Sequence, residues 1–575
     1  MPQVSRRSIL LAGGSSLLLA ALGGGGVPRA SEVLFRRSPS LPLSISGTTL
    51  EQAAVLSPGS GYRRLVAGPG FPVALREELA AARPGREARR RGAASIVQFT
   101  DLHIVDAQSP MRFEYLCKLD TSAFRPHEAL GTQAAAQLVD RVNQLAVGPF
   151  SGRVFDCVVS TGDNSDNNES VELDWFLTVM NGGIVVPNTG SATQWEGVQS
   201  SGDSLFYRPE SPTLDRYKSA GFPELPGFLD RAMRAHKSPG LATPWYSVFG
   251  NHDNSIGGTI PLAWSELEDL YTGPTKFTGF VSDSANRALA AAFRRARPAD
   301  PGMDARPDPR WQVTPDARRA PFTATDFIGA HLDPVATGPG PRGHGFTDDA
   351  AATGDAYYTF EIAPGVTGVA LDSTNQAGFT HGSLGSGQLE WLEAVLRSGS
   401  SRYFDADGST VRQQADDRYF VLFSHHTTRT MDNGLPDPRH PLETRHLGPE
   451  VVALAERYPN VLAWVNGHTH SNSITAHHGP TAAQGFWEIN TASHIEFPQQ
   501  ARVIEICTNE DGTLSLFTTL IESAAPYQAS YSDGSQRALA SLYREFSAND
   551  LNFTAAHEGT TLDRNTELML VDPLA

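Results

Sequence analysis

Five short apolar runs in this sequence each end in polar side chains that can bind metal ions. The runs and the residues that follow them are SIVQFT before Asp101, CVVST before Gly162 and Asp163, WYSVF before GNHD, YFVLF before SHH, and VLAWV before NGHTH. Continuous apolar runs of this length are typical of strands buried on both faces. A packed core does not accept so many His and Asp side chains unless they are paired or coordinate metals. We therefore expect the five strand ends to form a site outside the carboxyl ends of these strands.

Helical patterns lie between the strand-like runs, which favours an α/β core. They cover residues 128–145, 225–235, 387–397 and 449–457. Two long stretches rich in Pro, Gly and Asp, about 181–241 and 254–356, are interpreted as insertions, because structureless loops of that length are uncommon unless functional. The predicted division of the chain is a signal segment at 1–30, a Pro/Gly-rich arm at 31–92, a main domain at 93–525, and a C-terminal helix and strand at 526–575.

The charge of the chain limits its partners. The 46 basic and 63 acidic residues give a net charge of −17. Nucleic acid and anionic membranes repel such a chain at long range, so we expect no nucleic-acid partner. An anionic substrate then has to be attracted locally, which bound cations can do. The three cysteines, Cys117, Cys157 and Cys507, are too few for a disulfide framework, although one disulfide is left open.

The N-terminus is predicted to be an export signal. Arg6 and Arg7 precede an apolar stretch, residues 9–22, that is too short to span a bilayer. The segment SRRSILL resembles a twin-arginine signal, which implies export of the folded protein by the twin-arginine machinery. An ordinary secretory signal is the alternative, and a retained anchor stays open because no clear cleavage site follows. We expect no stable membrane span in the mature form and an extracytoplasmic location, secreted or associated with the cell envelope.

Five motifs in order, FTDLHIVD, TGDNSDN, FGNHDN, FSHHTT and NGHTH, resemble those of the calcineurin-like metallophosphoesterase superfamily. The resemblance covers roughly residues 95–519, and the segment INTASHIEFPQQAR is similar to a group of secreted bacterial members. It implies a layered αββα sandwich of two mixed β-sheets flanked by helices, here with large insertions. It also implies two metal ions and hydrolysis of phosphate monoesters or diesters by a metal-activated hydroxide.

The resemblance assigns a role to each residue of the metal site. It implies one ion held by Asp101, His103, Asp163 and His470, and a second held by Asp163, Asn251, His425 and His468. Asp163 would bridge the two. Carboxylate, imidazole and amide ligands suit ions such as Mn, Zn, Fe or Ca. Two ions about 3.5–4 Å apart can polarise a phosphoryl oxygen, generate the nucleophile and stabilise the leaving oxygen.

His252 resembles the family's histidine that does not bind metal. We expect it to donate to the phosphoryl or leaving-group oxygen, with Asp253 as its orienting carboxylate. Further candidates for substrate contact or for support of the site are Asn164, Asp166, His426, Arg429 and His494. Asp166 stands where purple acid phosphatases place a ferric tyrosinate ligand, so we expect no tyrosinate–iron colour.

Other functions fit the sequence less well. A zinc protease of the HExxH type is excluded for His127-Glu128, because no second His follows at the required spacing. The remaining alternative is a non-catalytic envelope binding protein on the same fold. Such a protein should have lost ligands or the catalytic histidine, whereas this chain keeps every one. The choice between monoester and diester, and the natural substrate, stay open.

Replacing Arg6 and Arg7 together by lysine should block export, because the change keeps the charge but removes the arginine pair that the twin-arginine machinery reads. The measurement is the distribution of the protein between cytoplasm and exported fractions. Normal export of the double variant would assign the signal to the ordinary secretory type.

Overall fold

The computed structural model describes residues 39–117, 121–261, 268–278, 287, 311–336 and 338–575. The predicted signal segment with Arg6 and Arg7, the start of the arm and part of the second insertion lie outside these residues. Within them, none of the helices combines the length and the apolar character needed to cross a membrane. The three cysteines lie among these residues, are buried and form no disulfide there.

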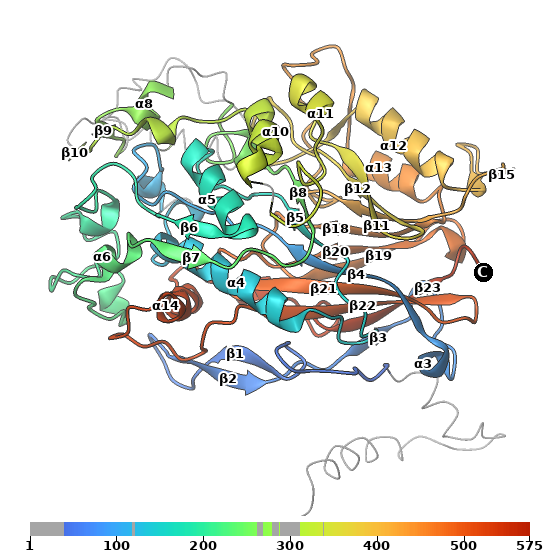
Figure 1. Ribbon diagram of the computed structural model, residues 1–575, viewed down its shortest axis with the longest axis horizontal. Helices are drawn as coiled ribbons and strands as arrows, with labels where there is room; N and C mark the ends of the chain where they lie inside the picture. Colours follow the sequence, from blue (N-terminus) through green and yellow to red (C-terminus); the bar gives the residue numbers. More distant parts are fainter. Residues whose placement is uncertain (1–38, 118–120, 262–267, 279–286, 288–310, 337) are drawn as a thin grey trace, which may run out of the picture.

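Two mixed β-sheets form the centre of the molecule, which confirms the predicted α/β class (Figure 1). The seven-stranded sheet has the order β3 (Ala74–Arg76), β23 (Thr566–Val571), β22 (Thr513–Glu522), β21 (Gln500–Thr508), β4 (Arg91–Phe99), β5 (Cys157–Thr161), β8 (Trp245–Val248). The six-stranded sheet has the order β11 (Tyr358–Ala363), β12 (Val366–Ala370), β16 (Tyr419–Phe423), β18 (Val461–Asn466), β20 (Phe486–Asn490), β19 (Ser473–His477). In the first sheet β4, β5 and β8 run parallel, and in the second β12, β16, β18 and β20 do. All five predicted strands are among these parallel strands.

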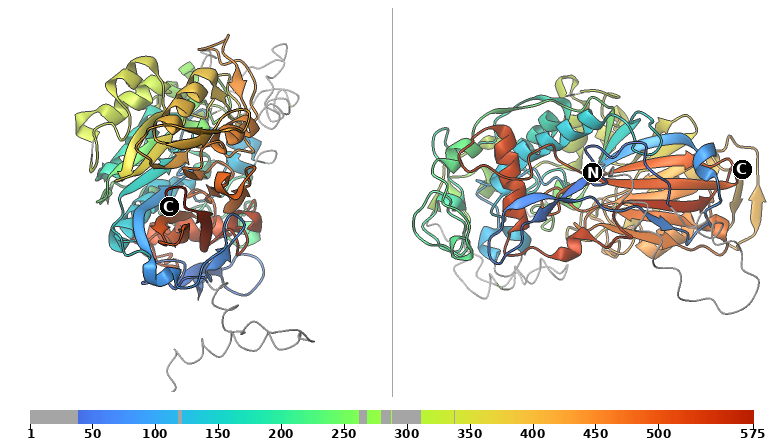
Figure 2. Two further views of the ribbon diagram at one scale, coloured as in Figure 1. Left: turned by 90° about the vertical axis from the view of Figure 1, so that its right-hand side faces the viewer. Right: turned by 90° about the horizontal axis from the view of Figure 1, so that it is seen from below.

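Side-chain alternation along the strands explains why the six-stranded sheet is covered on both faces. In β16, Val421 and Phe423 belong to the main core, which also contains side chains of β4 and β21. Phe420 and Leu422 point the other way and pack with residues of α12 (Ser386–Ser398) and α13 (Gly448–Ala455). One face of this sheet therefore packs on the other sheet and the opposite face on helices. The left view of Figure 2 shows the layers from the side.

Helices also cover the seven-stranded sheet. The helix α4 (Gly131–Leu145) lies along it and packs on α5 (Ser170–Asn181) and α14 (Gln536–Ala548) (Figure 1). The helices α6 (Phe228–Ala232), α8 (Glu268–Thr272), α10 (Ala324–Leu332) and α11 (Asp348–Thr353) belong to the two insertions, and α3 (Arg86–Arg89) to the arm. Small two-stranded sheets join β1 (Gln52–Leu56) to β2 (Leu65–Pro69), β6 (Gly183–Val185) to β7 (His236–Ser238), β9 (Thr275–Lys276) to β10 (Trp311–Gln312), β13 (Leu384–Gly385) to β17 (Arg445–His446), and β14 (Arg402–Phe404) to β15 (Thr410–Arg412).

Both chain ends contribute to the seven-stranded sheet. The strand β3 of the arm pairs with β23, the final strand, which pairs with β22. A buried ion pair joins the same two regions, because Arg86 Nε lies 2.8 Å from Glu567 Oε1. The helix α14 begins where the Ser535 side chain accepts the main-chain N–H of Ala538, which satisfies one of the free N–H groups of its first turn. The arm and the C-terminal segment are therefore parts of the folded core.

Candidate metal centre

The structure brings together all seven predicted metal ligands at the ends of five strands. Three come from the seven-stranded sheet, where Asp101 follows β4, Asp163 follows β5 and Asn251 follows β8. A fourth ligand, His103, comes two residues after Asp101. The remaining three come from the six-stranded sheet, where His425 follows β16 and the pair His468 and His470 follows β18. Carboxyl ends of parallel strands from two sheets thus converge on one place, as the strand-end pattern predicts.

The first group of ligand atoms contains Asp101, His103, His470 and Asp163. His470 Nε2 lies 3.3 Å from Asp101 Oδ1 and 3.2 Å from His103 Nε2. His103 Nε2 lies 3.7 Å from Asp163 Oδ2. Donor atoms that share one ion at about 2.0–2.2 Å lie about 3–3.5 Å from one another. Asp101, His103 and His470 are accordingly close enough together to hold an ion.

The second group contains Asp163, Asn251, His425 and His468. His425 Nε2 is its centre, 3.1 Å from Asp163 Oδ2, 2.9 Å from Asn251 Oδ1 and 3.2 Å from His468 Nδ1. Asp163 Oδ2 therefore belongs to both groups. The structure thus brings each of the two sets that the resemblance implies close together, around one carboxylate oxygen.

The backbone at these ligands is held in an uncommon conformation. The φ angle is 48° at Asp101, 43° at His103, 50° at Asp163, 70° at His468 and 54° at His470. Residues other than glycine rarely adopt positive φ, which costs of order 1–3 kcal/mol each and persists where the surroundings impose it. Such strain at five of the seven positions indicates that the fold holds the side chains in place for a function.

Two glycines allow the strand ends to approach one another. A side chain at Gly250 would collide with the main chain and carboxylate of Asp163, and one at Gly467 with Thr100 and the Asp101 carboxylate. Glycine is therefore required beside both Asp ligands.

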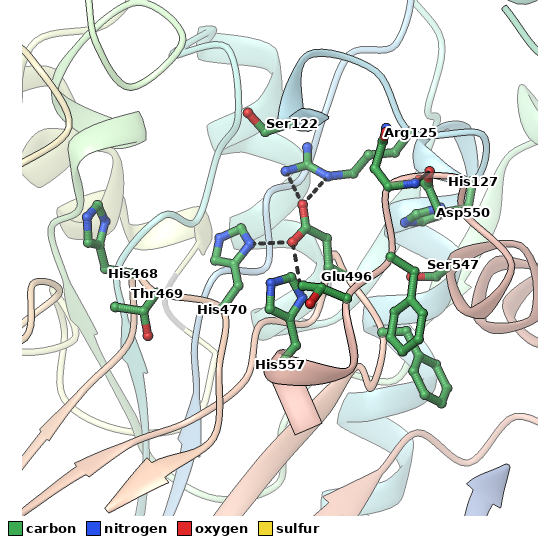
Figure 3. A pocket seen from close by; sticks show the side chains of 14 residues that line it. Ser122, Arg125, His127, His468, Thr469, His470, Glu496, Ser547, Asp550 and His557 are labelled. Carbon is green, nitrogen blue, oxygen red and sulfur yellow. Dashed lines mark hydrogen bonds and ion pairs between the residues drawn. The ribbon is translucent and has the colours of Figure 1, made fainter. Parts of the chain in front are cut away.

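Two carboxylates, the buried Asp166 and the half-buried Glu496, orient histidines of the first group from behind. Asp166 Oδ1 lies 2.7 Å from His103 Nδ1, and Glu496 Oε2 lies 2.9 Å from His470 Nδ1. Arg125 Nη2 lies 2.7 Å from Glu496 Oε1 (Figure 3), and its Nη1 lies 3.8 Å from Asp166 Oδ1. Carboxylates that accept from the second ring nitrogen of a ligating histidine fix its tautomer and orientation.

The four cage histidines differ in their electrostatics. Burial lowers the pKa of His103 to about 4 and that of His468 well below its ordinary value, whereas carboxylates raise the pKa of the other two. Burial lowers the pKa of His425, but Asp163, Asp101 and the Thr161 carbonyl together outweigh burial and raise that pKa to about 9. Burial likewise lowers the pKa of His470, while Glu496 and Asp101 raise it to about 10. Neighbouring carboxylates thus stabilise positive charge on the His425 and His470 rings. Divalent cations satisfy the same demand and leave the rings free to act as ligands, so the donor set fits them.

The structure places His252 beside the cage but corrects the role of Asp253. His252 Nδ1 donates to the main-chain carbonyl of Asp166 at 2.6 Å, and its ring lies edge-on to His103. The Asp253 carboxylate instead accepts from the main-chain N–H groups of Ser165 (3.0 Å) and Asn164 (3.2 Å). The expectation that Asp253 orients His252 was wrong, because neighbouring residues at the start of the short helix α7 (Asn251–Asn254) point in different directions. Asp253 stabilises the loop that carries Asp163.

The remaining candidates lie outside the two groups. Asn164 is buried, and its Nδ2 donates to the Val248 carbonyl. His426 lies next to His425 and His468, and these three could share an ion. However, both ring nitrogens of His426 already have partners: Nδ1 contacts Ser373 Oγ at 2.8 Å, and Nε2 donates to the Thr380 carbonyl at 2.9 Å. In this arrangement neither nitrogen is available to bind a metal ion.

For two other candidates the structure shows no side-chain contact with a cage ligand among the described residues. His494 is buried against Tyr543, and Arg429 is exposed. Sequence reasoning missed Arg125 and Glu496, although Glu496 lies in the TASHIEFP segment that it singled out for His494.

Comparisons with known proteins add little to this geometry. No family model matches the sequence, and no curated protein does either. Among solved structures, the chain is similar to a dimetal phosphatase from Danio rerio, with 11% identity, 75% of this chain and 100% of that chain covered, and a TM-score of 0.34. So weak a likeness carries no argument, and the assignment of the site depends on its own residues.

Changing the shared ligand should affect both groups. Asp163→Asn should lower metal content at both positions, because it removes the charge that the two groups have in common. Asn251→Ala should weaken mainly the second position. Metal-to-protein ratios after saturation and dialysis measure both effects, with Asp432→Asn, an exposed carboxylate paired with His381, as the matched control. A ratio of one or less in active unmodified protein, or equal losses in all three variants, would contradict the two-group arrangement.

Proposed function

We propose that this protein is an exported, dinuclear metal-dependent phosphoesterase of the calcineurin-like superfamily. One observation carries the proposal: two groups of carboxylate, imidazole and amide donors share Asp163 Oδ2. The ordered motifs that resemble those of the superfamily support it. The ligand types are compatible with ions such as Mn, Zn, Fe or Ca.

The protein side chains would orient the metal ligands, set the charge around the ions and donate a proton to the leaving oxygen. Two bound ions would supply Lewis acidity, by polarising a phosphoryl oxygen and promoting ionisation of water. Asp166 and Glu496 would keep His103 and His470 in their ligating orientation. Because the buried carboxylates alone would repel a phosphate ester, the substrate would bind only where cations offset them.

His252 is the residue that we assign to the leaving oxygen. A carbonyl can only accept, so the contact with Asp166 requires the proton on Nδ1 of His252. In the neutral ring Nε2 then carries no proton, and it donates only in the imidazolium form. The ring is 22% exposed, in contrast to the buried His103, so a substrate can reach it. These features support a general acid.

The completeness of the site favours an enzyme over the alternative of a binding protein on the same fold. A binding function requires neither the strained ligand positions nor an accessible histidine beside the cage. The proposal of export depends on the Arg6-Arg7 segment alone. It implies that the enzyme acts outside the cytoplasm. The proposed substrate is a small phosphate ester.

His252→Ala should reduce turnover of an alkyl phosphate ester by about 10²–10⁴-fold, and that of a nitrophenyl ester far less. The reason is that a nitrophenolate leaves as a stable anion without help from an acid. Steady-state kinetics with both esters measure the difference, and metal content should stay at the unmodified level.

His478→Ala, at an exposed histidine after β19, is the matched control and should leave both rates unchanged. An equal loss on both esters with metals retained would assign His252 to charge stabilisation on the phosphoryl oxygens. Full activity on both esters would remove it from the mechanism.

A further inference from the structure

Two hollows of different size and chemistry adjoin the metal centre. The larger has a volume of about 250 Å³ and is lined by His468 and His470 (Figure 3). The smaller has a volume of about 90 Å³ and is lined by His252. Ser122 borders both. A substrate whose phosphoryl group lies at the cage can therefore extend in two directions.

The larger hollow is polar and carries acidic side chains. Glu496 and Asp550 line it, together with Thr554 and the ring of Phe553. Its arginine, Arg125, is paired with Glu496 at 2.7 Å. A second phosphate or a carboxylate would meet the negative charge of Glu496, whereas the hydroxyls of an uncharged group can donate to carboxyl oxygens and its carbon atoms can lie on the aromatic ring.

The smaller hollow suits a smaller and less polar group. Phe113, Leu116 and Ala123 form its apolar part. The charged residues in its lining, Arg112 and Asp166, are buried and paired with each other, and His252 lies beside them. Since His252 is the residue assigned to the leaving oxygen, the group that departs belongs in this hollow. The group that stays on phosphorus belongs in the larger one.

The wall of the larger hollow comes from the C-terminal segment. Ser547 lies in the last turn of α14, and the lining residues Asn552, Phe553, Thr554 and His557 follow it in the chain. This segment is fixed to the metal site, because Asn472 N–H donates to the His557 carbonyl at 2.9 Å and His557 Nδ1 lies 3.7 Å from Glu496 Oε2. A segment placed in this way can determine which substrates fit.

We propose that the substrate is a phosphodiester whose larger arm is an uncharged, hydroxyl-bearing group held by the C-terminal segment. This inference rests on the proposed function and narrows it from phosphate esters to diesters. A monoester has one arm and would leave a hollow unused. In the reaction, the oxygen of water forms a bond to phosphorus and the bond to the smaller alcohol breaks. His252 gives its proton to the departing oxygen, and the proton lost by water goes to solvent. The products are a monoester of the larger group and a free small alcohol.

The test compares methyl glyceryl phosphate, dimethyl phosphate and methyl phosphate as substrates of the metal-loaded full chain. Methyl glyceryl phosphate should have the highest kcat/KM, about tenfold or more above dimethyl phosphate, because only its glyceryl arm fills the larger hollow. Analysis of the products should find methanol and glyceryl phosphate. Preferred release of glycerol, or faster hydrolysis of methyl phosphate than of either diester, would overturn the inference and leave the phosphoesterase function intact.

Two variants test whether the C-terminal segment causes the preference for the glyceryl diester. Thr554→Trp places a large ring at the exposed rim of the larger hollow and should lower the glyceryl-to-dimethyl ratio of kcat/KM by about tenfold. Ala556→Trp, an equally exposed position that does not line the hollow, should leave the ratio unchanged. Equal ratios in both variants would contradict the role of the segment. Absence of hydrolysis of all three esters, and of nitrophenyl phosphate, would instead contradict the proposed function itself.

Discussion

The rest of this structure depends on the mutual proximity of buried carboxylates and imidazoles around Asp163. Burial of unpaired charges costs several kcal/mol each, so such a group of side chains is stable only if positive charge is supplied to it. Neighbouring carboxylates raise the pKa of His425 to about 9 and that of His470 to about 10. Without metal ions, protons on these two rings would supply the positive charge that the carboxylates need. Cations bound between the donors would supply this charge instead and would also give an acidic chain a place to attract an anionic substrate.

The fold meets the geometric conditions for this centre in three ways. Parallel strands of two packed sheets end at the same place, which brings together ligands far apart in the sequence. The left-handed backbone at five ligands turns their side chains into the cage. Arg125 then links the two carboxylates that orient His103 and His470. Ligand positions are thus determined by main chain, neighbouring carboxylates and packing together.

The sequence predicted much of this arrangement, because strands buried on both faces are continuous apolar runs and their ends are visible as sudden changes to His and Asp. The same reasoning missed Glu496 and Arg125, which do not follow such runs and act only through contacts between distant segments. It misjudged Asp253, since adjacency to His252 in the chain does not mean contact in space. It predicted the final strand as an extension, whereas pairing with β3 and β22 makes that strand part of the main sheet. Pairing partners depend on tertiary structure, which local pattern does not contain.

Anomalous diffraction from crystals of the metal-loaded protein is the most direct test of the shared-ligand centre. We predict two anomalous peaks about 3.5–4 Å apart, with Asp163 Oδ2 between them. Asp101, His103 and His470 should surround one peak, and Asn251, His425 and His468 the other. A single peak, or a second peak held by His426 in place of Asn251 and His425, would contradict this prediction.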